Sequence, residues 1–163
     1  MPAKIKKRLQ ALKFSELAKP KFFSEVNKFI KELIVATIEK GISPVNQKTA
    51  EPKNTGGKSR YQKYSQSYID QMGTGSGDLA TKKQTPRNLV LSGKMLKSIK
   101  SRKAKNYVRV WFSDYKAKYH NEEGAGKSQV IRRMLPKDGE EFSRNIQNKI
   151  VEALGEAIKS VIK

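Results

Sequence analysis

The 163-residue chain contains no cysteine and a single histidine, His120. The absence of cysteine excludes a disulfide framework, a thiolate metal site and a cysteine nucleophile. One histidine without cysteines cannot make a usual zinc site. The longest apolar run, residues 33–38, is far too short to cross a bilayer. The basic N-terminus also lacks the apolar segment of a secretory signal, so we expect no membrane association.

Acidic residues are scarce, because 15 Asp and Glu face 35 Lys and Arg and give a net charge of +20. Residues 91–110 carry seven basic side chains and no acidic one. Such a field attracts polyanions and predicts a nucleic acid or an acidic protein as partner. A solvated basic surface that only maintains solubility is the alternative. The candidates for facing DNA are Lys94, Lys97, Lys100, Arg102, Lys103 and Lys105.

The apolar fraction of 36% predicts one modest core with arms. Residues 22–40 are predicted to form a helix that Ser24 caps. Residues 138–163 are predicted to form a second long helix, with Asp138 and Glu141 as a capping box. Residues 1–21 are predicted to be a basic arm, which Pro20 ends or interrupts. The remaining chain, 22–163, is predicted to be a single domain.

The stretch 88–100 changes its hydrophobic period. Leu89 and Leu91 are two apart, as in a strand, whereas Met95, Leu96 and Ile99 have the spacing of one face of a helix. Ser92 and Gly93 suit the start of that helix and close packing. Residues 106–113 are predicted to form a strand, and residues 130–135 a second one. Residues 115–124 are expected to form a short helix or a bend closing on Gly124. The expected core residues near these elements are Leu91, Met95, Leu96, Ile99, Val108, Val110 and Phe112.

These elements predict an α+β fold, in which a small, mainly antiparallel sheet is flanked by long N-terminal and C-terminal helices. Between them, residues 42–87 are predicted to be a long extended loop or arm. The spacing of Tyr61, Tyr64, Tyr68 and Met72 indicates a short helix within it, serving as a core piece or subunit contact, or stacking on bases. Residues 73–77 are expected to be a flexible hinge.

Two Gly-Lys-Ser sequences, at 57–59 and 126–128, imitate a phosphate-binding loop. That motif needs another glycine five positions before its last glycine, where Pro52 and Asn121 stand instead. Glu122 and Glu123 are adjacent, and no pattern supplies a partnered base or nucleophile. We therefore expect no enzyme activity and no cofactor. An enzyme would require His120 or the glutamate pair to be buried in a cleft with a shifted pKa.

Several short motifs follow one another in a recognisable order over residues 41–160. They are residues 89–99, the strand 108–112, the turn 117–124, the segment 132–136 and the amphipathic C-terminal helix. This order resembles the tail-completion, or virion-morphogenesis, proteins of tailed bacteriophages, which lie at the neck between head and tail. The residues that carry the resemblance are Leu91, Ser92, Gly93, Met95, Leu96, Ser98, Ile99, Tyr119, His120, Gly124, Arg132, Arg133 and Leu135.

The resemblance implies a structural, non-enzymatic virion protein, assembled in the host cytoplasm and placed in the neck. It implies a ring of identical subunits, a homohexamer, around packaged double-stranded DNA. Its partners would be the tail terminator or tube and the head-connector proteins. The turn 119–124 with Arg132 and Arg133 would fix the sheet geometry or contact a neighbour. The alternatives are a basic nucleic-acid-binding protein that does not read sequence, and a tail terminator subunit.

Overall fold

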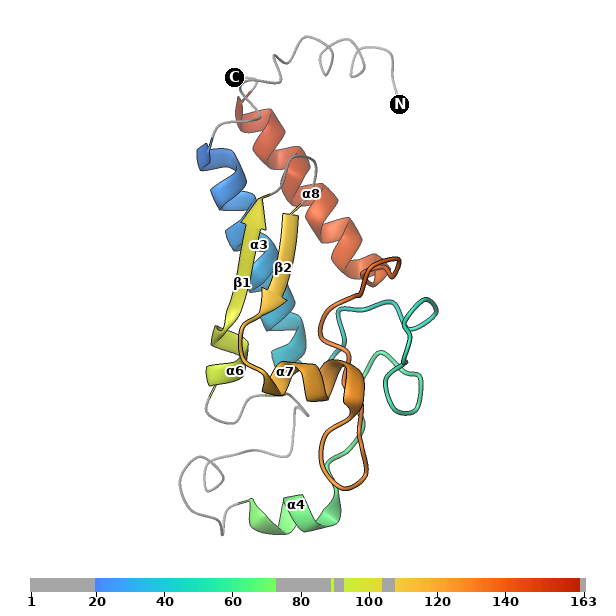
Figure 1. Ribbon diagram of the computed structural model, residues 1–163. Coiled ribbons are helices and arrows are strands. Elements are labelled where there is room, and N and C mark those ends of the chain that lie inside the picture. Colours follow the sequence, from blue (N-terminus) through green and yellow to red (C-terminus); the bar gives the residue numbers. More distant parts are fainter. Residues whose placement is uncertain (1–19, 73–88, 90–92, 104–107, 162–163) are drawn as a thin grey trace.

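The computed structural model describes residues 20–72, 89, 93–103 and 108–161. It combines helices with a two-stranded antiparallel sheet, which confirms the predicted α+β class (Figure 1). Outside the described residues lie the arm over 1–19, the expected hinge at 73–77, Leu91, Ser92 and Lys105. The elements are α3 (Pro20–Glu39), α4 (Gln66–Gln71), α6 (Lys94–Lys97), β1 (Ile99–Lys103), β2 (Val108–Phe112), α7 (Lys116–Lys118), the π-helical η1 (Tyr119–Glu123) and α8 (Arg144–Val161).

Helix α3 agrees with the predicted first helix but begins at Pro20 rather than after it. Proline suits a first helical position, because no intrahelical partner awaits its missing N–H and its φ is already helical. Ser24 lies within the helix and therefore does not cap it, contrary to the prediction. Ile30, Ile34 and Ile38 recur at every fourth position and are buried. Through this stripe α3 packs against both β1 and α8 (Figure 1).

Helix α8 begins at Arg144, so the predicted start at residue 138 is wrong. The residues before α8 are not helical. Gly139 adopts a φ of 84°, and Phe142 forms a β-bridge with Val45. The N–H of Ser143 donates to the carbonyl of Pro44 at 2.7 Å, and the Ser143 carbonyl accepts the first helical bond from Gln147. Tertiary hydrogen bonds therefore displace the capping box that the sequence predicted.

Residues 93–103 form one helical turn, α6, and then the strand β1. Gly93 precedes α6 with a φ of 75°, a conformation that glycine adopts without strain. The helical spacing predicted for Ile99 is wrong, because Ile99 begins β1 and pairs with Phe112. Strand β1 has the polar sequence Ile-Lys-Ser-Arg-Lys, so its extended form depends on pairing with β2. At its other end Lys103 pairs with Val108.

The strand predicted over residues 130–135 is wrong. This segment is irregular apart from a bridge between Val130 and Ala125, and its centre is buried. Its backbone groups bond to side chains and to the turn 119–124 rather than to a neighbouring strand, as described below. The partner of β2 is therefore β1, whose first residue, Ile99, had been predicted to lie on a helix.

Residues 42–72 are a loop with few regular elements, but this part of the predicted arm packs on the body of the protein. Val45, Ala50 and Tyr61 are each at most 2% exposed. The predicted tyrosine helix is shorter than expected, because α4 covers only Gln66–Gln71 and Tyr61 precedes it. Figure 1 shows α4 at the opposite end of the molecule from α3 and α8. The buried core cluster contains Ile30, Ile34, Ile38, Tyr61, Met95, Leu96, Ala117 and Met134.

Candidate functional site

Arg133 is a charged side chain with no exposure to solvent. Its guanidinium donates to the carbonyl oxygens of Pro52 at 2.8 Å and Leu135 at 3.3 Å. It also forms an ion pair and hydrogen bond with the carboxylate of Glu140. Burying a charge is costly unless it is paired and hydrogen-bonded, and Arg133 meets both conditions.

The backbone of Arg133 is held as firmly as its side chain. Its N–H donates to the side-chain oxygen of Asn54 at 2.6 Å. Its carbonyl accepts hydrogen bonds from the hydroxyl of Ser43 at 2.8 Å and from the hydroxyl of Tyr61 at 3.0 Å. These three partners come from the middle loop, so Arg133 fixes the segment 43–61 to the segment before α8.

Glu140 is the acidic partner of this arrangement, and its side chain is 7% exposed. Besides Arg133, its carboxylate accepts the backbone N–H of Glu51 at 2.7 Å and of Lys137 at 2.8 Å. Burial acts to raise the pKa of Glu140, but the two N–H donors and the Arg133 guanidinium together lower that pKa below its usual 4.5. Glu140 is therefore ionised and structurally committed at neutral pH.

The predicted turn 119–124 lies directly against the segment that contains Arg133. The N–H of Arg132 donates to the carbonyl of His120 at 2.7 Å. The side-chain oxygen of Asn121 accepts two bonds, from the N–H groups of Met134 at 2.7 Å and Leu135 at 3.0 Å. We call these connected residues, Ser43, Asn54, Tyr61, Asn121, Arg133 and Glu140, the Arg133 junction.

The turn itself closes at Gly124, as predicted. The N–H of Gly124 donates to the carbonyl of Tyr119 at 2.7 Å, which completes the π-helical turn η1. Gly124 has a φ of 87°, and a Cβ there would lie 2.3 Å from the carbonyl oxygen of Gln129. The chain then makes an exposed turn over residues 126–129, bridged by Ala125 and Val130. The Gly-Lys-Ser at 126–128 thus forms no phosphate loop, because no helix follows it.

Arg132 lies among aromatic rings on the other side of the same segment. It is 6% exposed, and its guanidinium carbon lies 5.6 Å from the centroid of the Tyr64 ring, a cation–π contact. Burial lowers the pKa of Arg132, while Tyr64, Tyr61 and Tyr68 act to raise it. Of the predicted tyrosine stripe, Tyr61 is therefore part of the buried core and Tyr64 contacts Arg132.

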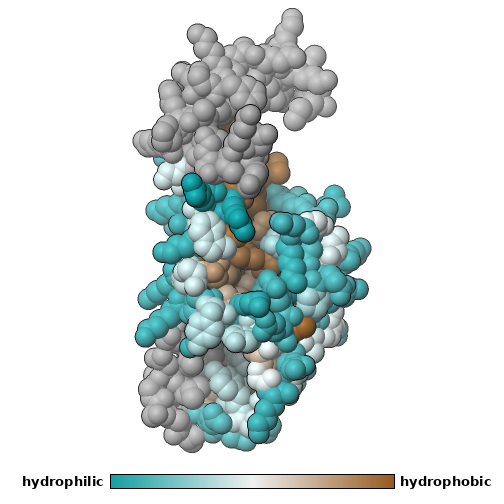
Figure 2. All heavy atoms as spheres, in the orientation of Figure 1, coloured by the Kyte–Doolittle hydropathy of each residue, from teal (hydrophilic) through white to brown (hydrophobic). Residues whose placement is uncertain are grey.

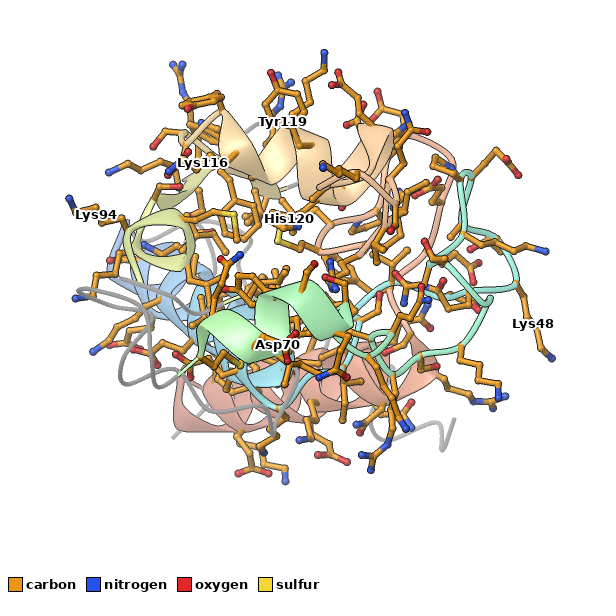
Figure 3. The ribbon with its side chains drawn as sticks, turned by 90° about the horizontal axis from the view of Figure 1, so that it is seen from below. Lys48, Asp70, Lys94, Lys116, Tyr119 and His120 are labelled. Carbon is orange, nitrogen blue, oxygen red and sulfur yellow. The ribbon has the colours of Figure 1, made fainter. Side chains whose placement is uncertain are left out.

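His120 belongs to η1, and its label in Figure 3 falls between that turn and α4. Burial, and secondly the nearby charge of Arg132, lowers its pKa to about 4. Its Nδ1 atom and the Nε atom of Arg132 are buried and have no hydrogen-bond partner among the described residues. At neutral pH the imidazole is therefore uncharged beside the guanidinium of Arg132.

Other residues of the short motifs between 89 and 136 connect or fill these elements. The hydroxyl of Ser98 donates to the carbonyl of Met95 at 2.7 Å and accepts the N–H of Asp114 at 3.1 Å, so Ser98 joins α6 to the end of β2. Tyr119 is 47% exposed, and its ring meets that of Tyr115 edge to face at 6.1 Å. Met95 and Leu96 are buried in the core, and Leu89, Ile99, Val110, Phe112 and Leu135 are half-buried against it.

The residues predicted to face DNA are exposed where the structure describes their side chains. Lys94, Lys97, Lys100 and Arg102 are exposed along α6 and β1. The side chain of Lys103 lies outside the described residues. Figure 3 shows Lys94 and Lys48 pointing outward from opposite sides of the molecule. The exposed cations of α6 and β1 can contact a polyanion, whereas Arg132 and Arg133 are buried.

A cleft of about 720 Å³ lies beside β2. Val110 and Phe112 line one side, and Leu135 and Phe142 contribute apolar surface. Figure 2 shows hydrophobic side chains gathered in the middle of this face, with hydrophilic ones on either side. Glu122 lines the cleft but forms an ion pair with Lys137 at 3.6 Å. His120 does not line it, so the histidine with the shifted pKa and the cleft are separate features.

Sequence reasoning missed three members of the Arg133 junction, Ser43, Asn54 and Glu140, whereas Asn121 lies in the predicted turn 119–124. Serine and asparagine are common in exposed loops, and no local pattern distinguishes those buried by distant contacts. Glu140 was overlooked because Asp138 and Glu141 have the spacing of a capping box. The one signal in the sequence was the pair Arg132-Arg133, because an arginine that is buried needs an acidic partner such as Glu140.

Comparison with models of protein families, with curated proteins and with solved structures finds no match in any of the three. Across the described ranges, no group of three or more His, Asp or Glu side chains is placed to hold a metal ion. No helix of those ranges has the length and apolarity needed to cross a membrane.

Proposed function

We propose that this chain is a structural subunit of the neck of a tailed bacteriophage, which completes the tail and joins it to the head connector. The observation that carries the proposal is the contact between the two motif segments that resemble this family. Arg132 bonds to His120, and Asn121 bonds to Met134 and Leu135. Segments that are separate in the sequence thus act as one scaffold.

The polar groups of this scaffold serve the protein itself. Arg133 and Glu140 are satisfied by each other and by backbone groups, and Asn121 uses its oxygen to hold two N–H groups. Such an arrangement holds a surface in one shape, which suits a subunit that must present fixed contacts to its neighbours. It supplies no nucleophile next to a base.

The charge distribution supports a position around DNA. The exposed Lys97, Lys100 and Arg102 are followed by β2 rather than by a base-reading helix. Cations of this kind contact phosphates without reading sequence. Such contacts are weakened by salt and allow a duplex to move past them.

Reconstruction of a phage particle by cryo-electron microscopy tests the proposal, using a tailed phage whose genome carries this gene. The expected result is density for the chain at the junction of head and tail. Deletion of the gene should leave filled heads and tails that do not join. Density at the tail end before joining would favour the tail terminator alternative, and absence from the particle would overturn the proposal.

The second candidate is a nucleic-acid-binding protein that acts alone, and the observation that favours it is the net charge of +20. Titration of the isolated protein with duplex DNA at increasing salt separates the two. Tight binding with a steep salt slope at physiological ionic strength favours the second candidate. Weak binding there is expected of a neck subunit.

A further inference from the structure

Strand β2 has an outer edge with unpaired backbone groups. The N–H of Ser113 donates to the carbonyl of Ser98. Because the hydrogen-bonding direction alternates along a strand, the backbone groups of Trp111 and Arg109 also point toward β1. The N–H and C=O groups of Val108, Val110 and Phe112 therefore point away from β1. Within the described part of the chain, none of the hydrogen bonds outside the sheet involves these groups. An edge of this kind is a template for another strand.

This edge opens into the cleft beside β2. The cleft volume of about 720 Å³ falls within the range of roughly 300–1,000 Å³ that is common for binding clefts. Leu135 and Phe142 line the cleft together with Val110, so an incoming strand would pair with β2 and cover apolar side chains at the same time. Trp111 beside it is 37% exposed and Tyr115 at its end is 70% exposed.

We propose that β1 of a second copy of this chain enters the cleft and pairs antiparallel with β2. This inference rests on the proposed function, because that function supplies the ring in which the copies would assemble. By the same alternation, the free groups of β1 belong to Ile99, Ser101 and Lys103. Figure 1 shows β1 at the left edge of the two-stranded sheet and β2 at its right edge, and both strands have five residues.

Charge favours this occupant over a random partner. Strand β1 is basic, with exposed Lys100 and Arg102 and no acidic residue. The cleft contains three carboxylates in a chain that has only 15, Asp114, Glu122 and Asp138. Glu122 is paired with Lys137 of the same lining and Lys118 with Glu123, which leaves Asp114 and Asp138 against Arg109. The lining is therefore less positive than the average surface of a chain with a net charge of +20, which favours a basic strand here.

Shape selects between the possible pairings. Paired strands lie about 4.8 Å apart, so one of the two edges must reach the other without obstruction. The β2 edge is recessed between Leu135, Phe142 and α7, and two recessed edges cannot approach each other to this distance. Pairing β1 of one copy with β2 of the next is a head-to-tail contact, and such contacts close into a ring when the rotation between copies permits.

Cysteine cross-linking tests the pairing without background, because the chain has no cysteine. The side chains of Trp111, Lys100 and Arg102 are exposed. In the proposed pairing, Trp111 of one copy lies opposite Lys100 or Arg102 of the other as a non-hydrogen-bonded pair. The Cβ atoms of such pairs are about 4.5–5.5 Å apart. Full-length Trp111→Cys protein is mixed with full-length Arg102→Cys or Lys100→Cys protein and oxidised. The matched control is Lys149→Cys, an exposed position on α8. Circular dichroism checks that each variant folds.

The expected result is a mixed disulfide between the β2 and at least one β1 variant, at a yield at least several-fold above that with the α8 control. Native mass spectrometry should show oligomers of the unmodified protein. Oligomers without the mixed disulfide would overturn strand pairing and leave the ring of the proposed function intact. A dominant Trp111→Cys homodimer, or a monomer at every concentration, would also overturn it. A mixed disulfide in a protein absent from virions would keep the pairing and reject the neck function.

Discussion

Arg133 and Glu140 form an ion pair in which the side chains are 0% and 7% exposed. The pair connects the segment before Pro136 to the turn that leads into α8. Two charges buried together gain less than their attraction suggests, because both lose their hydration. Removing one of them is different, since the other is left buried and uncompensated.

We therefore predict that Glu140→Gln destabilises the protein by about 3–5 kcal/mol. The glutamine would leave the Arg133 guanidinium without a counter-charge and weaken the bonds to the N–H groups of Glu51 and Lys137. Urea unfolding followed by circular dichroism measures the change. Glu156→Gln is the control, because the Glu156–Lys159 pair is largely exposed and should matter little. Equal stability of the two variants would contradict the structural role of Glu140.

We predict that stability falls as the pH drops from 6.5 to about 4 through His120. Its pKa is lowered from 6.5 to about 4, mainly by burial. The unfolded chain therefore binds a proton in this window while the folded one does not, so the free energy of unfolding is greatest above pH 6.5. The loss by pH 4 should be on the order of 3 kcal/mol.

Urea unfolding at a series of pH values measures this dependence, and His120→Gln supplies the comparison. The variant cannot titrate at this position, so its stability should change less between pH 6.5 and 4. Below pH 4.5 the lowered pKa of Glu140 adds a loss in the same direction, because protonation removes the favoured carboxylate. Parallel curves for the two proteins above that pH would show that His120 is not the titrating group.

Gly124→Ala should be far more damaging than Gly126→Ala. Both glycines have positive φ values, 87° and 73°, so either alanine incurs backbone strain of about 1 kcal/mol or more. Only at Gly124 would the new Cβ also collide with backbone, 2.3 Å from the Gln129 oxygen. We expect thermal unfolding to show a loss for Gly124→Ala at least about 2 kcal/mol larger. Similar melting temperatures would mean that the turn can open without cost.

The exposed cations of α6 and β1 should dominate any contact with DNA. Replacing Lys97 and Lys100 with glutamine should lower the slope of log affinity against log salt by about 2, if each contacts one phosphate. Fluorescence anisotropy with a labelled duplex at several salt concentrations measures the slope. Replacing Lys48 and Lys149, which are exposed elsewhere, removes the same charge. An equal effect of both double variants would show a diffuse field rather than a contact surface.

The sequence predicted the elements that have a strong hydrophobic periodicity. The stripe that contains Ile30, Ile34 and Ile38 predicted α3, and the alternation of Val108, Val110 and Phe112 predicted β2. Gly124 was correctly placed at the close of a turn, since glycine alone adopts its φ freely. Met95 and Leu96, which were expected in the core, are buried.

Local pattern determined α3, β2 and the body of α8, because a hydrophobic period is written in neighbouring residues. Tertiary structure alone decided that the polar segment Ile99–Lys103 is a strand, that Arg132 and Arg133 are buried, and that α8 starts at Arg144. Each of these depends on a partner far along the chain: β2 for the strand, Asn54 and Tyr61 for Arg133, and Pro44 for the start of α8. Pairing between distant residues leaves no period in the sequence, so only the folded chain reveals it.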